Sequence, residues 1–352
     1  MNSKRDKSHF QGCLLGGAIG DSLGWPVEFK SYAEITRIYG VEGIKDLDTG
    51  CGKFAEVTDD TQMTVFTAEG LLRAETMRNL VGSCNIPNVV YNSYIRWLHT
   101  QGGICKGRED VISNLDGWVS GIKSLYSNRA PGNSCLSALR SGQMGRIAEP
   151  VNNSKGCGGV MRVAPVGLVA SKEQAFSLGC EIAAITHGHP SGYLSAGVLS
   201  YIIYGLIEGI ELRDSILLAI DEMEKWEGHE ECAKLLQLAV ELADKGRPSL
   251  KAIRQLGAGW TGEEAIAIAV YSSLSYPQDF SKALCLSVNH DGDSDSTGAI
   301  TGNIMGAYLG VERIPQKWIE KVELKKELII LAEDLLKGFE AGEQWINKYP
   351  AW

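Results

Sequence analysis

The chain lacks the short motifs that define several large enzyme classes. Its nine cysteines are all more than twenty positions apart, so there is no C-x-x-C pair for structural zinc or for thioredoxin-type chemistry. H-E-x-x-H does not occur either, so the signature of zincins is absent. Alternating apolar and polar runs joined by hairpin turns are also missing, so strands are not expected.

The sequence carries no signal for secretion or for a membrane. The first ten residues, MNSKRDKSHF, contain no apolar core. The longest apolar stretch, Tyr193–Ile210, includes Ser195, Ser200 and Glu208 at helical spacing, which is typical of a buried helix. An odd number of cysteines without a secretion signal indicates free thiols. We therefore expect a cytoplasmic protein with no membrane partner.

The chain has fewer basic than acidic residues. The 352 residues include 34 Lys and Arg against 43 Asp and Glu, giving a net charge of −9. This balance argues against bulk nucleic acid as a partner, because such binding depends on basic residues that neutralise phosphates. A small anionic ligand stays possible if a metal or a loop supplies local positive charge. With 44% hydrophobic and 22% charged residues, the composition is that of a globular protein.

Apolar residues recur at helical spacing through most of the chain, which predicts a mainly helical fold. The predicted helices are Gly12–Leu23, Asp60–Glu75, Val89–Leu98, Ala175–Thr186, Tyr193–Glu208, Leu212–Lys225, Glu230–Lys245, Glu263–Ser275, Thr297–Leu309 and Ile319–Phe339.

Two of these segments carry glycine at every fourth position. The first stripe is Gly12, Gly16, Gly20 and Gly24, and the second is Gly298, Gly302, Gly306 and Gly310. Residues four apart share one face of a helix, and each glycine costs a helix about 0.5–1 kcal/mol relative to alanine. Close approach of two backbones would offset that cost. The stripes therefore predict two central helices packed tightly, near each other.

One glycine motif matches a dinucleotide fingerprint only by its letters. Gly257-x-Gly259-x-x-Gly262 follows LKAIRQL, which has helical rather than strand character, whereas the fingerprint requires a preceding strand. We interpret these glycines as a turn. Thr261 and Glu264 then have the spacing of a capping box at the start of the next helix.

Acidic residues cluster at two predicted helix starts. Thr58-Asp59-Asp60-Thr61 opens one helix, and Asp291-Gly-Asp293-Ser-Asp295-Ser-Thr297 opens the second glycine-striped helix. Helix capping alone explains any single Asp. Crowded carboxylates, however, repel unless they are protonated or a cation neutralises them. Oxygen donors without Cys or paired His favour Mg²⁺, Mn²⁺ or Ca²⁺ over zinc, so the two clusters predict one shared metal site.

A further candidate is the glycine cluster Gly156-Cys157-Gly158-Gly159. Clustered glycines can turn backbone N–H groups toward an anion such as a phosphate, although a plain flexible loop has the same spacing. His187 and His189 lie in THGHP at a predicted helix end. Each alone is typical of a structural histidine.

Taken together, six segments resemble the ADP-ribosylglycohydrolase family. They occur in the family's order over residues 12–310 and are GCLLGGAIGDSLGWPVE, TDDTQM, SKGCGGVMRVAPVGL, THGHPSGYLSAG, GAGWTGEEAIAIAVY and GDSDSTGAITGNIMGAYLG. The resemblance implies an all-α fold: one compact domain of orthogonal helices spanning residues 1–352, with helices of 315–345 packed on it, built around a binuclear metal site.

The resemblance also implies site residues. The metal ligands, for two Mg²⁺ ions with Mn²⁺ as a substitute, would be Thr58, Asp59, Asp60, Asp293, Asp295 and Ser296. The ADP-ribose contacts would come from Ser154, Gly156, Cys157, Gly158, Gly159, Met161, His187 and Trp260. Cys157 stands where some relatives carry Asn. Glu28 matches a glutamate near the metals, and Glu28, Asp59 and Asp60 compete for the role of catalytic base.

The function expected from the resemblance is Mg²⁺-dependent hydrolysis of the bond between ADP-ribose and a modified protein side chain. The GDSDSTG, HGHPSGYL and GAGWTGEEA segments are more similar to the arginine-directed branch than to the serine-directed one. Alternatives are release from serine, an acetyl ester, a nucleic-acid base or a toxin-modified target, and a non-catalytic ADP-ribose binder or a crystallin-like structural relative. The expected partner is an ADP-ribosylated protein, and a monomer is compatible with the sequence.

Overall fold

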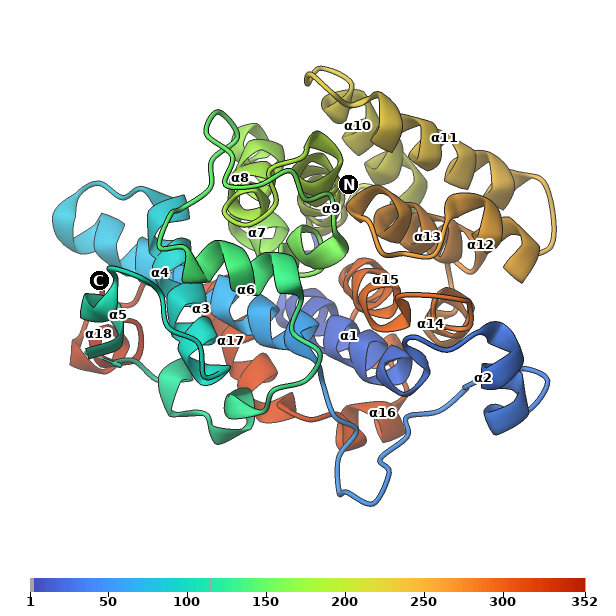
Figure 1. Ribbon diagram of the computed structural model, residues 1–352, viewed down its shortest axis with the longest axis horizontal. Coiled ribbons are helices and arrows are strands. Elements are labelled where there is room, and N and C mark those ends of the chain that lie inside the picture. Colours follow the sequence, from blue (N-terminus) through green and yellow to red (C-terminus); the bar gives the residue numbers. More distant parts are fainter. Residues whose placement is uncertain (1–2, 114, 352) are drawn as a thin grey trace.

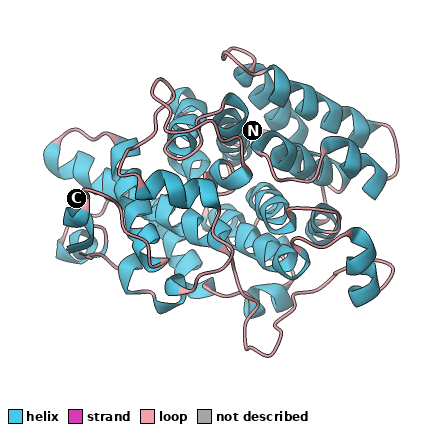
Figure 2. Cartoon of the chain, viewed as in Figure 1, coloured by secondary structure: helices cyan, strands magenta, loops and turns pink. Residues whose placement is uncertain are grey.

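The computed structural model describes residues 3–113 and 115–351, and within them the chain is all-α. Figure 2 shows helices joined by loops, and the β-pairing in this part of the chain is limited to the isolated bridges Ala55–Val322 and Gly156–Thr261. The helices are α1 Lys7–Gly24, α2 Tyr32–Tyr39, α3 Asp59–Val81, α4 Ile86–Thr100, α5 Glu109–Ser113, α6 Asn133–Arg140, α7 Ala164–Val169, α8 Lys172–Ala184, α9 Pro190–Ile207, α10 Leu212–Met223, α11 Glu230–Asp244, α12 Leu250–Leu256, α13 Gly262–Ser275, α14 Phe280–Val288, α15 Ser294–Leu309, α16 Gln316–Lys321, α17 Lys325–Lys337 and α18 Glu343–Lys348, with short 3-10 helices at Trp25–Val27, Val119–Gly121, Lys123–Tyr126, Cys157–Gly159 and Val311–Arg313.

Helices α1 and α15 form the antiparallel pair at the centre of the molecule (Figure 1). Their glycine stripes face each other. A Cβ added to Gly20 would lie 1.9 Å from the carbonyl oxygen of Gly298, and one added to Gly16 would lie 2.3 Å from that of Gly302. Distances this short leave no space for any side chain. The predicted tight packing of the two stripes is therefore confirmed, and it explains why glycine is used despite its cost in a helix.

Helix α9 passes through the core. It is long and apolar enough to cross a membrane by length and composition, but 89% of its apolar window is buried inside the protein. It packs against α7, α8, α10 and α13. The interpretation of this stretch as a buried helix is consistent with that packing.

The prediction of one continuous helix over Ile319–Phe339 is wrong. The chain divides it into α16 and α17, and Leu324 between them has a left-handed backbone with φ of 58°. The break allows residues 321–323 to pair with Ala55, whose N–H donates to Lys321 O at 2.8 Å and whose carbonyl accepts from Glu323 N–H at 3.1 Å. Tertiary pairing thus overrides the helical periodicity.

The predicted capping box at Thr261 does not form. Thr261 is the N-cap of α13, but its hydroxyl has no hydrogen-bond partner. Glu264 instead accepts from the backbone N–H groups of Ala258 and Gly259, at 3.2 and 3.1 Å. Its carboxylate therefore stabilises the preceding turn. That turn follows α12, and Gly257 and Gly259 have φ of 119° and 85°, as expected for a turn rather than a nucleotide-binding fingerprint.

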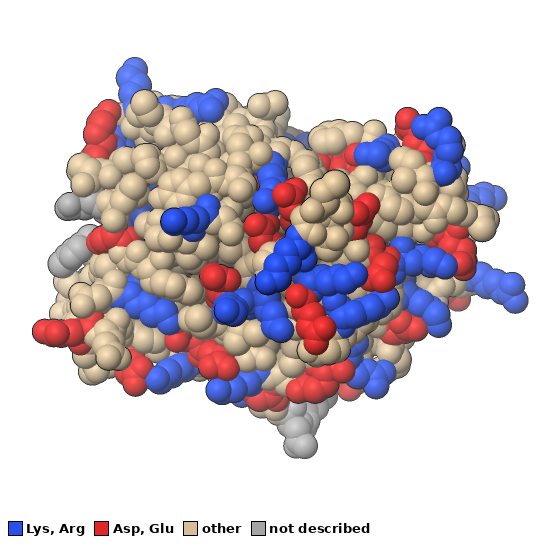
Figure 3. All heavy atoms as spheres, turned by 90° about the horizontal axis from the view of Figure 1, so that it is seen from below, with Lys and Arg blue, Asp and Glu red and all other residues tan. Residues whose placement is uncertain are grey.

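Acidic and basic side chains alternate on the face seen in Figure 3. The net charge of −9 is therefore not spread as a uniform acidic field over that face. The unusual concentration of acid is buried, in the site formed around α1, α3 and α15.

Candidate metal and ligand site

The two acidic clusters lie at the N-termini of α3 and α15. Thr58 is the N-cap of α3, and its side chain accepts from the N–H of Asp60. Asp293 is the N-cap of α15 and accepts from the N–H of Ser296. The positive ends of both helix dipoles therefore face the same buried space. Glu28 reaches that space from the segment that follows α1.

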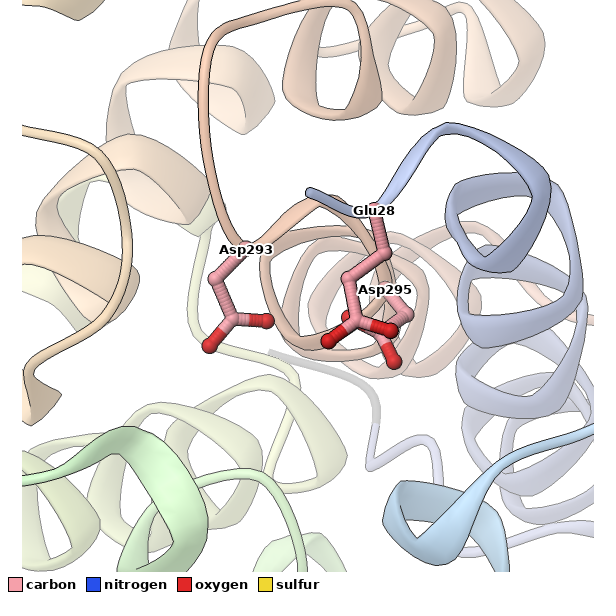
Figure 4. Close-up of side chains that lie close together, drawn as sticks. All are labelled: Glu28, Asp293 and Asp295. Carbon is pink, nitrogen blue, oxygen red and sulfur yellow. The ribbon is translucent and has the colours of Figure 1, made fainter. Parts of the chain in front are cut away.

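Three carboxylates converge most closely. Glu28, Asp293 and Asp295 each offer an oxygen, and these oxygens lie within 4.8 Å of one another. Figure 4 shows the three carboxylate groups directed toward a common space. The α3 cluster meets them, because Ser296 Oγ lies 3.4 Å from Asp60 Oδ1. The predicted convergence of acids separated by more than 200 positions is present in the fold.

A cavity of about 340 Å³ opens beside the carboxylates. Twelve of the residues singled out from the sequence line it: Glu28, Asp59, Asp60, Gly156, Cys157, Gly158, Met161, His187, Trp260, Asp293, Asp295 and Ser296. Phe29 and the segment from Ala130 to Cys135 complete the lining. The volume is within the range of small-molecule sites.

Three of the predicted site residues do not line this cavity. The hydroxyl of Thr58 is used as the helix cap. Ser154 Oγ shares a hydrogen bond with Ser134 Oγ at 2.8 Å and accepts from Gly156 N–H. Gly159 packs below the loop, where an added Cβ would lie 2.9 Å from Gly192 O. These three residues therefore support the cavity wall without lining the cavity.

Burial of the carboxylates raises their pKa values in the metal-free protein. Burial, reinforced by the charges of Asp293 and Asp59, raises the pKa of Glu28 to about 8. Burial also raises the pKa of Asp59 to about 8, although the hydrogen bond from Gly132 N–H opposes this shift. The pKa of Asp295 is raised by burial and by Asp293. Ionising these carboxyl groups therefore costs free energy, and a bound cation would lower that cost.

Several basic side chains of the neighbouring segments pair away from the cluster, and the charge of Lys30 offsets only part of the rise in the pKa of Glu28. The pairs are Arg129 with Glu323 and Glu56, Arg254 with Asp291, and Lys155 with Glu231 and Glu263. Glu28 Oε2 and Asp60 Oδ2 are buried without a hydrogen-bond partner. Such oxygens require a partner from outside the chain. The carboxylates and the Ser296 hydroxyl are hard donors, so the residues present fit a divalent cation such as Mg²⁺.

The glycine loop, residues 156–159, borders the same cavity as the start of α3. Residues 155–157 pair with 260–262 through Cys157 N–H to Trp260 O at 3.1 Å and Gly262 N–H to Lys155 O at 2.8 Å. His187 is buried against it, and a Cβ at Gly158 would lie 3.0 Å from His187 Cε1. Burial, with the charge of Arg162, lowers the pKa of His187 to about 3, so the ring is neutral.

The exposed mouth of the cavity carries an aromatic pair. The rings of Phe29 and Trp260 stack with centroids 5.1 Å apart. Phe29 has a left-handed backbone, with φ of 61°, and follows Glu28 directly. Trp260 is therefore held by a ring contact as well as by the loop pairing.

Sequence reasoning missed Asp21 and misplaced Asp291. Asp21 is buried, and it accepts from the N–H groups of Thr58 and Thr61 and from Thr61 Oγ1 at 2.5 Å, so it fixes the start of α3. A lone acid within an apolar, glycine-striped helix was the available signal. Asp291, in contrast, turns outward and accepts from Tyr32 N–H and Arg254. It does not crowd Asp293 and Asp295.

The fold and site define an all-α protein in which acids from two helix N-termini meet beside a cavity and could hold a metal ion. The chain belongs to the ADP-ribosylglycohydrolase family, which it matches over residues 2–344. The resemblance inferred from the six segments is thereby confirmed.

Named relatives cover nearly the whole chain. The chain is 24% identical to the ADP-ribosylhydrolase ARH3 of Mus musculus, covering 96% of this chain and 94% of the relative. It is 25% identical to the ADP-ribosylarginine hydrolase of Serratia proteamaculans, covering 92% and 78%. A solved ADP-ribosylglycohydrolase-related protein complex superposes with a TM-score of 0.62 at 22% identity, covering 95% of this chain and 98% of that one. That structural likeness supports the all-α fold.

Proposed function

We propose that this protein is a Mg²⁺-dependent hydrolase that cleaves the glycosidic bond between ADP-ribose and an arginine side chain of a modified protein. One observation carries the proposal. A buried cluster of carboxylates with unpartnered oxygens borders a ligand-sized cavity in a chain of the ADP-ribosylglycohydrolase family.

The residues that would hold Mg²⁺ are the oxygen donors at the two helix N-termini: Asp59, Asp60, Asp293, Asp295 and Ser296, with Glu28 beside them. When bound, Mg²⁺ supplies a positive charge that orients ribose hydroxyls and lowers the pKa of water. Thr58 caps α3 by accepting from Asp60 N–H, and the second lone pair of its hydroxyl oxygen stays available to a metal.

Glu28 is the strongest candidate for the base. Hydrolysis at the anomeric carbon of the distal ribose passes through an oxocarbenium-like state and needs water from which a carboxylate takes a proton. Glu28 Oε2 and Asp60 Oδ2 both lack a partner, but Asp60 is held through Oδ1 by Ser296, and Asp59 is held through Oδ2 by Gly132 N–H at 3.1 Å. Glu28 is therefore the least constrained of the three. The buried carboxylates together favour the positive charge that develops on the sugar.

The glycine loop is the candidate diphosphate contact. The N–H groups of Gly156 and Cys157 already donate to Ser154 Oγ and Trp260 O. An anion in the cavity would therefore meet the backbone of Gly158, at the start of the short 3-10 helix. The neutral His187 ring beside it offers a hydrogen-bonding edge without adding charge.

Arginine is favoured as the modified side chain for two reasons. The guanidine departs most easily as a guanidinium cation, and a site lined by carboxylates favours a cation more than a neutral serine hydroxyl. The relative from Serratia proteamaculans is named an ADP-ribosylarginine hydrolase. Metals would neutralise part of the acidic charge, so the electrostatic argument supports a preference rather than strict selection.

Matched peptides test the proposal. Peptides carrying ADP-ribosyl-arginine or ADP-ribosyl-serine at the same position are incubated with the protein, with Mg²⁺ or with EDTA, and released ADP-ribose is measured. We expect faster release from arginine, and only with Mg²⁺. Faster release from serine would overturn the arginine assignment. If neither peptide is cleaved but the protein still binds free ADP-ribose, the protein is an ADP-ribose binder rather than a hydrolase.

A further inference from the structure

A thiol lies directly on the acidic cluster. Cys157 Sγ donates to Asp293 Oδ2 at 2.8 Å, and Ser296 Oγ lies 3.5 Å from the same sulfur. Cys157 also lines the cavity that the carboxylates border. The sulfur therefore faces the predicted metal ligands rather than being sequestered within the glycine loop.

The surroundings of this thiol point to a cation independently of the cysteine. Glu28 Oε2 and Asp60 Oδ2 have no hydrogen-bond partner, and their residues are only 8% and 2% exposed. Both residues line the same cavity as Cys157. A cation placed there would be offered several carboxylate oxygens and one sulfur.

A mixed set of sulfur and oxygen donors has a distinct metal preference. Mg²⁺ takes oxygen ligands and gains nothing from a thiol, whereas Zn²⁺ and Co²⁺ accept carboxylate together with thiolate, and soft Cd²⁺ favours sulfur. A site with oxygen donors alone would lack this added preference for thiophilic ions over Mg²⁺. Cys157 is therefore the residue that could make this centre receptive to thiophilic ions.

We propose that the acidic centre binds a thiophilic divalent cation through Cys157 Sγ together with Asp293, in competition with Mg²⁺. Binding forms one metal–sulfur bond and releases the thiol proton to solvent, and no electron transfer is involved. The inference rests on the proposed metal centre and adds a means of inhibiting it. A thiophilic ion held by sulfur would occupy the place that catalysis requires for Mg²⁺.

A second cysteine on the same cavity provides the matched control. Cys135 also lines the cavity and is buried, but Arg162 Nη1 lies 3.4 Å from its sulfur. The fixed positive charge of that guanidinium repels a metal cation. Cys135 therefore borders the same cavity as Cys157 and is the more buried of the two, but its sulfur contacts the Arg162 guanidinium instead of Asp293.

The experiment is a titration of the metal-free protein with Co²⁺, followed by absorption spectroscopy. Thiolate coordination gives an intense near-ultraviolet ligand-to-metal band, whereas oxygen ligands give only weak visible bands. We expect the intense band in the wild type and in Cys135→Ser, and its loss in Cys157→Ser and Cys157→Ala. We also expect Cd²⁺ affinity to fall about tenfold or more in the Cys157 variants, because even outer partners of metal ligands contribute about 10–100-fold.

The outcomes separate this inference from the proposed function. Binding of Co²⁺ with weak visible bands only, or an intense band that persists in Cys157→Ser, would overturn the sulfur ligand and leave the oxygen centre standing. Failure of the wild type to bind Co²⁺, Cd²⁺ or Mg²⁺ would overturn the metal centre and the proposed function with it. Circular dichroism of each variant establishes that it is folded.

Discussion

Ser296 Oγ lies 3.4 Å from Asp60 Oδ1, although the two residues are 236 positions apart in the sequence. The contact joins the first turn of α15 to the first turn of α3. Both helices therefore direct the positive ends of their dipoles toward the same acidic site, and this partial positive charge offsets some of the repulsion among the carboxylates. We expect a bound cation to neutralise the repulsion among the carboxylates that remains.

Removing one carboxylate from either cluster should abolish turnover without unfolding the protein. We expect Asp59→Ala and Asp293→Ala each to lower turnover by about 100-fold or more, because even outer partners of metal ligands are worth about 10–100-fold. Asp59→Ala also removes an anion from a site of mutual repulsion, so the stability of the metal-free protein should stay level or rise. In Asp293→Ala that gain is opposed by loss of the α15 N-cap, which costs about 0.5–2 kcal/mol. Hydrolysis at limiting Mg²⁺ and thermal unfolding in EDTA measure the two effects.

Asp291 provides the control for these variants. It belongs to the same sequence motif as Asp293, but it faces Tyr32 and Arg254 outside the cavity. Asp291→Ala should leave the Mg²⁺ dependence of turnover unchanged. Full activity of Asp59→Ala at limiting Mg²⁺ would contradict the metal assignment.

Glu28→Gln should separate catalysis from binding. The amide keeps the size of the carboxylate but cannot accept a proton, so we expect turnover to fall by about 10²–10⁴-fold, the range typical of general acid–base catalysis. ADP-ribose affinity, measured by calorimetry, should change much less. Equal losses of affinity and turnover would show that Glu28 is a structural residue instead.

The central helix pair should not tolerate a methyl group. A Cβ at Gly20 would lie 1.9 Å from Gly298 O, so the two backbones must separate in Gly20→Ala. We expect the free energy of unfolding to fall by about 2–3 kcal/mol, the upper part of the range for overpacking. The control is Gly121→Ala, since nothing lies within 4 Å of a Cβ at Gly121. Equal stability of the two variants in denaturant titrations would contradict the inferred close packing.

Much of the fold could be predicted because its determinants are local or periodic. Glycine at every fourth position of residues 12–24 and 298–310 required close helix packing, and acids at two helix starts required a common neutralising group. The convergence of these acids on Glu28 was inferred from the family resemblance. The structure then supplied the contacts that bring Asp60 and Ser296 together.

The rest depended on tertiary contacts that leave no sequence pattern. The break at Leu324 comes from pairing with Ala55, far away in the chain. Glu264 does not form the predicted capping box, because its carboxylate accepts from the backbone N–H groups of Ala258 and Gly259. The cavity wall from Ala130 to Cys135 has no periodicity or charge to mark it. Such features follow from the assembled fold rather than from any one segment.

The stability of the metal-free protein should depend on pH in a direction that Mg²⁺ reverses. Burial raises the pKa of Glu28 from 4.5 to about 8 and that of Asp59 from 3.8 to about 8. A group whose pKa is raised on folding stabilises the folded state fully below its unfolded pKa, and this contribution is lost as pH rises through the folded value. The buried His187 and His290 act the other way below about pH 6.5, because burial lowers their pKa values from 6.5 to about 3 and about 4. In EDTA, the Tm should therefore decrease between about pH 6.5 and pH 8, where only the carboxylates still titrate.

Mg²⁺ should act most strongly at the upper end of that window, because it binds the deprotonated carboxylates. At a concentration about 100 times its Kd, a ligand that binds only the folded state contributes about 2.7 kcal/mol. We expect the rise in Tm caused by Mg²⁺ to be small at pH 5 and large at pH 8, and to shrink in Asp59→Ala. Differential scanning calorimetry with and without Mg²⁺ measures it. A Tm in EDTA that is flat or rising from about pH 6.5 to pH 8 would show that the carboxylates are not held in mutual repulsion, and the electrostatic basis for the metal centre would be lost.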